Sequence, residues 1–148
     1  MSSLSIDRLL IDEVAARMQS IQRFTPVENG VRVNTHCMYP SNDMVHVTVY
    51  GSGSSYIVTD SGRAVSQAEK AGAKIEKPDA FAKARDIKSQ GLLMENGAIR
   101  SPVVELDAVP AAIMLVANAS KEIADHIFNV YRLSRKTGEA LPRRDGSL

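Results

Sequence analysis

Four consecutive residues, Thr59-Asp60-Ser61-Gly62, place two hydroxyl groups, a carboxylate and a glycine directly after the alternating segment "SYIV". A carboxylate at the end of a strand can serve as a general base or bind a metal ion. It can equally accept hydrogen bonds from the N–H groups of Gly62 or Arg63 and begin the following helix. Because no convincing second catalytic residue accompanies the motif, the sequence favours a structural turn.

Two histidines offer a different chemistry. In the strand register expected below, His36 faces His46, and Asp60 can join them from the third strand. Two imidazoles and a carboxylate can bind a metal ion, so a metal-dependent nuclease or hydrolase is one alternative function. A solvated sheet face is the simpler interpretation, and it is the one we favour. We therefore expect no metal and no cofactor.

Basic residues gather in the segment 63–100, which carries eight Lys and Arg against five Asp and Glu. Two short helices followed by a ribbon there suggest a winged helix-turn-helix, with "DAFAKARDIKSQ" as the reading helix and "MENGAI" as the wing. The acids Asp79 and Asp86 on that helix argue against DNA binding, which is the second alternative. Its candidate contacts are Lys83, Arg85, Lys88 and Arg100.

The composition bounds the class of protein. A chain of 148 residues that is 44% hydrophobic and 24% charged fits one globular domain, and a net charge of +1 names no partner. The single cysteine, Cys37, cannot form an internal disulfide, which suits a reducing compartment. Because no apolar run approaches the length of a membrane span, we expect a cytoplasmic protein with no membrane contact.

The elements follow from periodicity. Residues 6–21 repeat apolar side chains at helical spacing and predict an amphipathic helix that packs on a sheet. From position 31 the period becomes two, and "VRVNTHC", "MVHVTVY" and "SYIVT" predict an antiparallel meander. The breaks "TP" and "NG" separate the helix from the meander. The expected apolar pairs are Cys37 with Val45, Thr35 with Val47, and Val33 with Val49; the expected polar pairs include Asn34 with Thr48 and Arg32 with Tyr50.

The second half predicts a helix over 64–71, another over 79–90, a hairpin at Asn96-Gly97 and a helix of about 27 residues beginning near Asp107. The predicted fold class is α+β. A three-stranded antiparallel meander is packed by N- and C-terminal helices, beside a small winged-helix-like subdomain of two helices and a ribbon. Residues 1–134 form this single domain, and 135–148 form a flexible basic tail.

The order of these elements resembles a known bacterial family. The strand "VRVNTHCMY", the segment "YIVTDSG", a short helix, "GLLMENGAI" and a long closing helix are similar to domain-of-unknown-function family 1828, whose members share a Leu-Thr-Asp-Asp-Gly-like motif. This chain has Val58 in place of the commoner Leu and Ser61 in place of the second Asp. The resemblance covers residues 30–134 and implies an architecture and a bacterial or phage origin. It implies no particular activity.

Together these observations predict a function. We expect a non-enzymatic module that binds a protein partner, of the accessory, regulatory or inhibitor kind that bacteria and phages encode. The long C-terminal helix is apolar over more than one stripe, so we expect the protein to form a homodimer through this helix. The edge of the meander offers a further surface to a protein partner.

Overall fold

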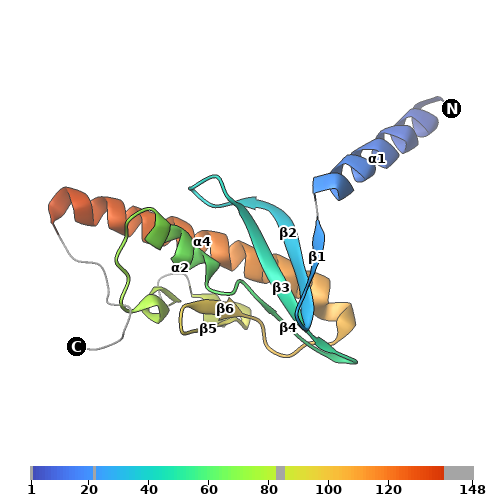
Figure 1. Ribbon diagram of the computed structural model, residues 1–148. Helices are drawn as coiled ribbons and strands as arrows, with labels where there is room; N and C mark the ends of the chain where they lie inside the picture. Colours follow the sequence, from blue (N-terminus) through green and yellow to red (C-terminus); the bar gives the residue numbers. More distant parts are fainter. Residues whose placement is uncertain (1, 22, 83–85, 139–148) are drawn as a thin grey trace.

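A computed structural model describes residues 2–21, 23–82 and 86–138, and it shows an α+β fold (Figure 1). Within these residues, six strands form one open antiparallel sheet in the order β1-β2-β3-β4-β6-β5. The predicted fold class is confirmed. The elements are α1 (Ser2–Ile21), β1 (Phe24–Val27), β2 (Gly30–Met38), β3 (Met44–Ser52), β4 (Ser55–Thr59), α2 (Arg63–Lys70), β5 (Leu93–Glu95), β6 (Ala98–Arg100) and α4 (Val109–Thr137), with 3₁₀ turns η1 (Pro78–Ala80), η2 (Ile87–Gln90) and η3 (Leu106–Ala108).

The first strand, β1, was not predicted. We expected "TP" and "NG" to break the chain, but β1 forms a hairpin with β2 in which Val27 pairs with Gly30. Pro26 is tolerated because β1 is the edge strand, where a missing N–H need not remove a ladder hydrogen bond. Asn29 completes the turn with a φ of 63°, a left-handed conformation that asparagine adopts more readily than most residues.

The central meander is present, but its register differs from the prediction. Met38 pairs with Met44 as expected, whereas Val33 pairs with Val47, two positions from the expected Val49. An irregularity between positions 34 and 38 causes the difference. Since the shift is two residues, every side chain keeps its face. The predicted pairing of His36 with His46 is wrong, because the cross-strand partner of His46 is Asn34.

The ribbon belongs to the main sheet rather than to a separate subdomain. Asn96 and Gly97, with φ values of 52° and 84°, form the predicted two-residue hairpin turn. Strand β6 then joins β4, where Ser101 N–H donates to the Val58 carbonyl over 2.8 Å. A continuous reading helix over 79–90 is not present, because Asp86 has a left-handed φ of 50° that interrupts it.

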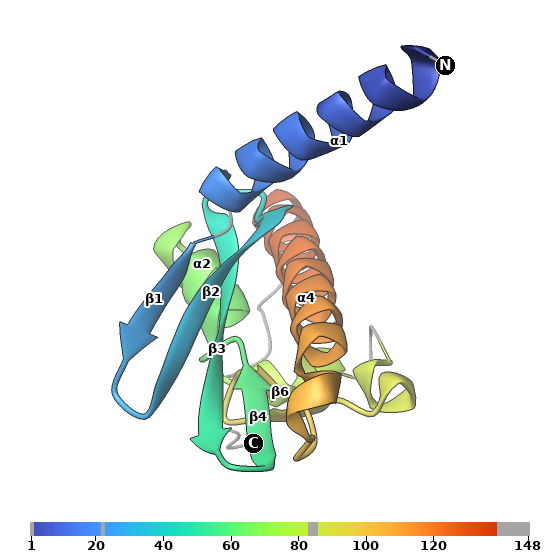
Figure 2. The same ribbon diagram turned by 90° about the vertical axis from the view of Figure 1, so that its right-hand side faces the viewer.

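The core lies between the sheet and α4, with α2 packed beside α4 (Figure 2). Helix α4 is 29 residues long and buries one stripe against the valines of β3 and β4. The buried side chains that meet here include Val45, Val47, Val58, Ala64, Val65, Ile99, Val116, Ile123 and Ile127. Burying this apolar surface supplies the main stabilisation of the fold.

Helix α1 does not pack on the sheet as the sequence predicted. Its main contact with the described part of the chain is with β2, and it extends away from the sheet and from α4 (Figure 2). Leu9, Leu10 and Ile11 are 66%, 59% and 64% exposed. Val14 and Met18 are exposed as well. The structure therefore leaves these five apolar side chains of α1 largely uncovered by the described residues.

Candidate functional site

The turn that follows β4 is built around the Asp60 carboxylate. Its Oδ1 accepts the Gly62 N–H over 2.9 Å, and its Oδ2 accepts the Ala64 N–H over 3.3 Å. Ser61 and Gly62 have φ values of 56° and 77°, so the chain reverses through two left-handed residues before α2 begins. These bonds agree with the predicted structural role of Asp60: of the two donors expected as alternatives, Gly62 bonds to its side chain, and Ala64 rather than Arg63 supplies a further N–H.

Thr59 completes the turn from the other side. Its hydroxyl donates to the Ile99 carbonyl over 2.9 Å and accepts the Ser61 N–H over 3.1 Å. Asp60 N–H also donates to the Ile99 carbonyl, over 3.0 Å. The four predicted motif residues are thus brought together, and they connect β4, β6 and α2.

Asp60 also binds groups from distant parts of the chain. Its Oδ1 accepts the Ile99 N–H over 2.8 Å, and its Oδ2 accepts the Ser120 hydroxyl over 2.8 Å. The side chain is only 1% exposed. Burial raises the pKa of this carboxyl above its ordinary value, while the bonds from Ile99, Ser120, Gly62 and Ala64 act in the opposite direction. The carboxylate is therefore a buried connection between elements.

A tyrosine extends this connection. The Tyr39 hydroxyl lies 2.7 Å from Ser120 Oγ, and because Ser120 donates to Asp60, Tyr39 donates to Ser120. Burial raises the pKa of Tyr39 well above its ordinary value, although the bond with Ser120 lowers it. Sequence reasoning missed both Tyr39 and Ser120. The available signal was a serine within the apolar stripe of α4, since a polar residue there needs a buried partner.

His46 has a different environment from Asp60. Burial, with the positive charges of Arg63 and Arg32, lowers the pKa of His46 to about 4, whereas Asp43 acts in the opposite direction. The imidazole is therefore neutral near pH 7. The side chain of His36 lies outside what the structure describes. Nowhere in the described part of the chain do three or more His, Cys, Asp or Glu side chains gather as a metal site.

Arg63 links the turn to the loop between β2 and β3. Its guanidinium lies 5.7 Å from the centre of the Tyr39 ring and donates to the Met44 carbonyl over 3.3 Å. In the next turn of α2, the buried Gln67 accepts a hydrogen bond from Ser41. These contacts hold the loop against α2, so the polar residues here also act between elements.

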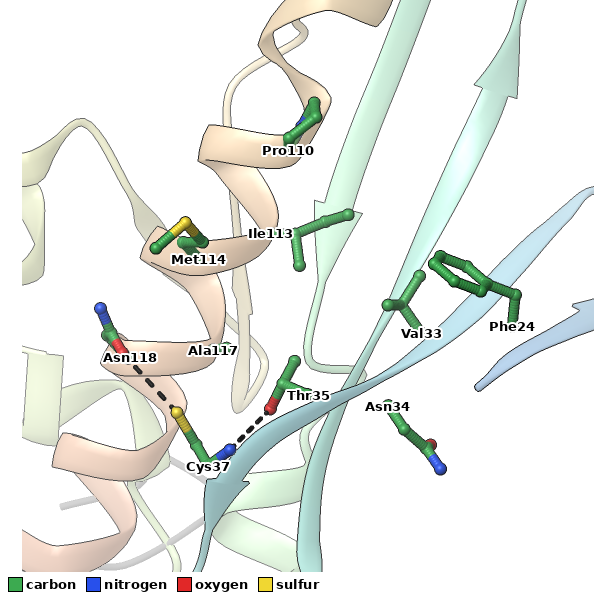
Figure 3. A pocket seen from close by; sticks show the side chains of 10 residues that line it. All are labelled: Phe24, Val33, Asn34, Thr35, Cys37, Pro110, Ile113, Met114, Ala117 and Asn118. Carbon is green, nitrogen blue, oxygen red and sulfur yellow. Dashed lines mark hydrogen bonds between the residues drawn. The ribbon is translucent and has the colours of Figure 1, made fainter. Parts of the chain in front are cut away.

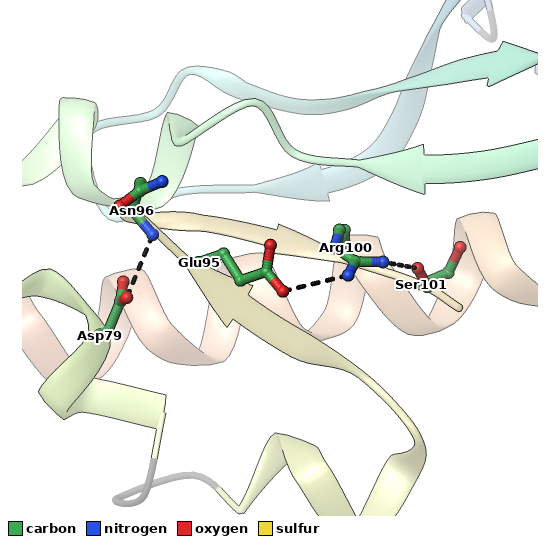
Figure 4. A network of polar contacts seen from close by, with 5 residues as sticks. All are labelled: Asp79, Glu95, Asn96, Arg100 and Ser101. Atoms are coloured by element: carbon green, nitrogen blue, oxygen red, sulfur yellow. Dashed lines mark hydrogen bonds and ion pairs between the residues drawn. The ribbon is translucent and has the colours of Figure 1, made fainter. Parts of the chain in front are cut away.

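The candidate nucleic-acid contacts do not form one described surface. Lys83 and Arg85 lie outside the described residues. Lys88 is exposed on η2, whereas Arg100 on β6 donates to Glu95 over 3.0 Å and to the Ser101 carbonyl over 3.3 Å (Figure 4). The ion pair neutralises Arg100, which weakens its attraction for phosphate.

Asp79, whose negative charge argues against DNA binding, holds the β5–β6 turn that was expected to form the wing. The Asp79 carboxylate accepts the Asn96 N–H over 3.1 Å (Figure 4) and the Gly97 N–H over 2.7 Å. Asp79 therefore fixes the tip of the β5–β6 hairpin. These two hydrogen bonds explain why an acidic residue occupies position 79.

An apolar groove lies between β1–β2 and the first half of α4 (Figure 3). It encloses about 320 Å³. The Cys37 thiol lies within it, 3.8 Å from Asn118 Oδ1. The sequence did not reveal this groove because β1 was not predicted. Its lining residues are Phe24, Val33, Asn34, Thr35, Cys37, Pro110, Ile113, Met114, Ala117 and Asn118.

Comparisons with models of known protein families, with characterised proteins and with solved structures found no match for this chain. The resemblance to family 1828 therefore depends on the sequence motif and the order of elements. Among the described residues, no helix combines the length and the apolar character needed to cross a membrane.

Proposed function

We propose that this protein is a non-enzymatic protein-interaction module that forms a homodimer, of the accessory, regulatory or inhibitor kind encoded by bacteria and phages. The observation that carries the proposal is the apolar surface of α1, which the described part of the chain leaves uncovered. We call Leu9, Leu10, Ile11, Val14 and Met18 the α1 surface. Contiguous apolar surface of this kind in a folded protein marks an interaction site.

Helix α4 adds a second apolar region. Met114 and Leu115 are 61% and 40% exposed, and Met114 also lines the groove. This region supports the expectation that the C-terminal helix takes part in the homodimer, and we propose the N-terminal half of α4 as the part that does so. Phe24, which is 67% exposed on β1, extends the same apolar region across the groove.

The turn at Asp60 supports a binding role over a chemical one. A general base must reach a proton of its substrate, directly or through one water molecule. Asp60 instead faces the protein interior and accepts four hydrogen bonds from the chain itself. The strongest candidate catalytic residue of the sequence is thus occupied with holding the fold together.

Sedimentation velocity over micromolar concentrations tests the proposal. We expect the wild-type protein to dimerise. The double variant Leu10→Gln/Val14→Gln should weaken dimerisation at least about a hundredfold, because four apolar side chains lose their burial in each dimer. The control Asp12→Asn/Glu13→Gln changes exposed polar residues of the same helix and should dimerise like the wild type.

Two outcomes would contradict the proposal. One is a strict monomer throughout this concentration range. The other is a shift of duplex DNA at low salt that weakens steeply as salt rises, with further loss in Lys88→Glu, because counterion release is typical of a phosphate-binding protein.

A further inference from the structure

We infer that α1 of one copy lies in the groove of a second copy, and that α1 of the second copy lies in the groove of the first. The inference rests on the proposed homodimer and specifies which surfaces meet. Two-fold symmetry makes such an exchange reciprocal, so each copy both gives and receives one helix.

The connection between α1 and the sheet directs the helix away from its own groove. Arg23 is already fixed to the sheet, because its carbonyl accepts the Asn34 N–H over 2.9 Å. Only position 22 separates this anchor from Ile21, the last residue of α1. From this short connection α1 extends away from α4 and the sheet (Figure 2). Within the described part of the chain nothing covers the α1 surface, and a second molecule can supply that cover.

The groove begins where α1 ends. Phe24, the first residue of β1, lines the groove and follows α1 by three positions. The opposite wall runs along α4 from Pro110 to Asn118 (Figure 3). A two-fold axis near Phe24 would place each α1 against the other copy's groove. The two unpartnered apolar regions are thus adjacent in the chain and complementary in character.

The lengths of the two surfaces match. The α1 surface runs from Leu9 to Met18, about 14 Å along the helix, and the α4 wall of the groove runs from Pro110 to Asn118, about 12 Å. The apolar face of α1 can therefore meet the whole α4 wall of the groove in a second copy.

The charge of α1 favours a protein partner over a lipid surface. The helix carries two basic and three acidic residues: Arg8, Arg17, Asp7, Asp12 and Glu13. Helices that lie on anionic membranes are rich in Lys and Arg on their polar face. In water, moreover, most helices depend on packing of an apolar face for their stability. Docking into the apolar groove of a second copy supplies that packing.

Cys37 provides a direct test, because it is the only cysteine and it lines the groove. Three variants place a second cysteine on the apolar stripe of α1: Leu10→Cys, Val14→Cys and Met18→Cys. Two controls place it on the opposite face: Asp12→Cys and Ala16→Cys. After mild oxidation, a non-reducing denaturing gel should show a covalent dimer for at least one stripe variant, and at most a trace for the controls.

A mixture of two chains shows which cysteines react. One chain carries Val14→Cys together with Cys37→Ser, and the other is the wild type with a tag that changes its size. The only disulfide between the two unlike chains then joins α1 of one to the groove of the other. We expect this mixed product to predominate, and the same pairing should be made with Leu10→Cys and Met18→Cys.

Several results would overturn the inference. A disulfide within one chain would show that α1 closes on its own groove, and a product from two α1 cysteines would show that the helices pair with each other. A sedimenting dimer with no bridge to Cys37 from any stripe position would also overturn it, while leaving the homodimer intact. A strict monomer would remove both this inference and the proposed function.

Discussion

Ser120 donates a hydrogen bond of 2.8 Å to Oδ2 of Asp60, and both side chains are buried although 60 positions separate them in the chain. The bond joins the middle of α4 to the turn between β4 and α2. Tyr39, the residue directly after β2, continues the connection. One carboxylate thus organises four elements of the fold, which predicts how the protein responds when it is changed.

Replacing Asp60 should destabilise the whole domain. In Asp60→Ala the N–H groups of Gly62, Ala64 and Ile99 and the Ser120 hydroxyl lose their acceptor within a dry interior. We expect the free energy of unfolding to fall by about 3–5 kcal/mol, measured by urea denaturation. The exposed Ser66→Ala on α2 is the control and should change it by less than about 0.5 kcal/mol. Unchanged stability in Asp60→Ala would contradict the structural role.

The Tyr39–Ser120 bond should be coupled energetically to Asp60. Ser120→Ala removes a donor to the carboxylate and leaves the Tyr39 hydroxyl unpaired, so we expect a loss of about 1–3 kcal/mol. In Tyr39→Phe/Ser120→Ala the unpaired hydroxyl is absent, and the combined loss should be smaller than the sum of the single losses. A double-mutant cycle in urea measures this coupling, and strict additivity would mean that the three groups do not act together.

The local part of this site was predictable from sequence. A strand followed by Asp60 and Gly62 indicates a turn, because such side chains bond to N–H groups only a few positions away. The bonds to Ile99 and Ser120 were not predictable, since they depend on how β6 and α4 pack. The register of β2 illustrates the same limit: alternation assigned each face correctly, whereas one irregularity moved every pair from Gly30 to Asn34 by two positions.

The surroundings of α1 were the largest departure from prediction. The period of Leu10, Val14 and Met18 indicates an amphipathic helix, and it says that one face needs cover. The pattern does not identify the surface that covers this face. Packing on a sheet of the same chain and packing in a groove of another copy require the same spacing of apolar residues. The unpredicted strand β1 mattered as well, since Phe24 forms part of the groove.

The folded protein should lose stability as His46 becomes protonated in the unfolded state. The pKa of His46 is about 4 in the folded protein, against an ordinary value of 6.5. Above pH 6.5 both states are neutral and the effect is absent. As the pH falls from 6.5 to 4 the unfolded state binds a proton that the folded state does not, so stability decreases.

Comparison with His46→Gln separates this effect from that of Asp60, because the raised pKa of Asp60 makes stability change with pH in the opposite direction. A carboxyl with a raised pKa in the folded state favours folding at low pH, and that contribution is lost as pH rises. The difference in unfolding free energy between wild type and His46→Gln should therefore be constant above pH 6.5 and change in favour of the variant between pH 6.5 and 4. A difference that is flat across this window would rule out the lowered pKa.

The tip of the β5–β6 hairpin should depend on glycine at position 97. Gly97 has a φ of 84°, and an added Cβ would lie 3.3 Å from the Pro78 ring. Gly97→Ala should therefore lower the free energy of unfolding by about 1–3 kcal/mol. Asn96→Gly is the matched control, because glycine adopts its φ of 52° readily, and it should differ from wild type by less than about 1 kcal/mol. Equal stability of the two variants would contradict this turn geometry.

Hydrogen exchange should distinguish the amides protected by the folded domain from those protected by dimer formation. The amides of Gly62, Ala64 and Ile99 are bonded to Asp60 inside the folded domain, so their protection should not depend on protein concentration. The amides of α1 depend on a helix whose apolar side chains are uncovered in a single copy, and we expect their exchange to slow as concentration rises and dimers form. In Leu10→Gln/Val14→Gln this dependence should disappear, while the amides bonded to Asp60 stay protected. Protection of α1 that is high and independent of concentration would mean that the helix needs no second copy.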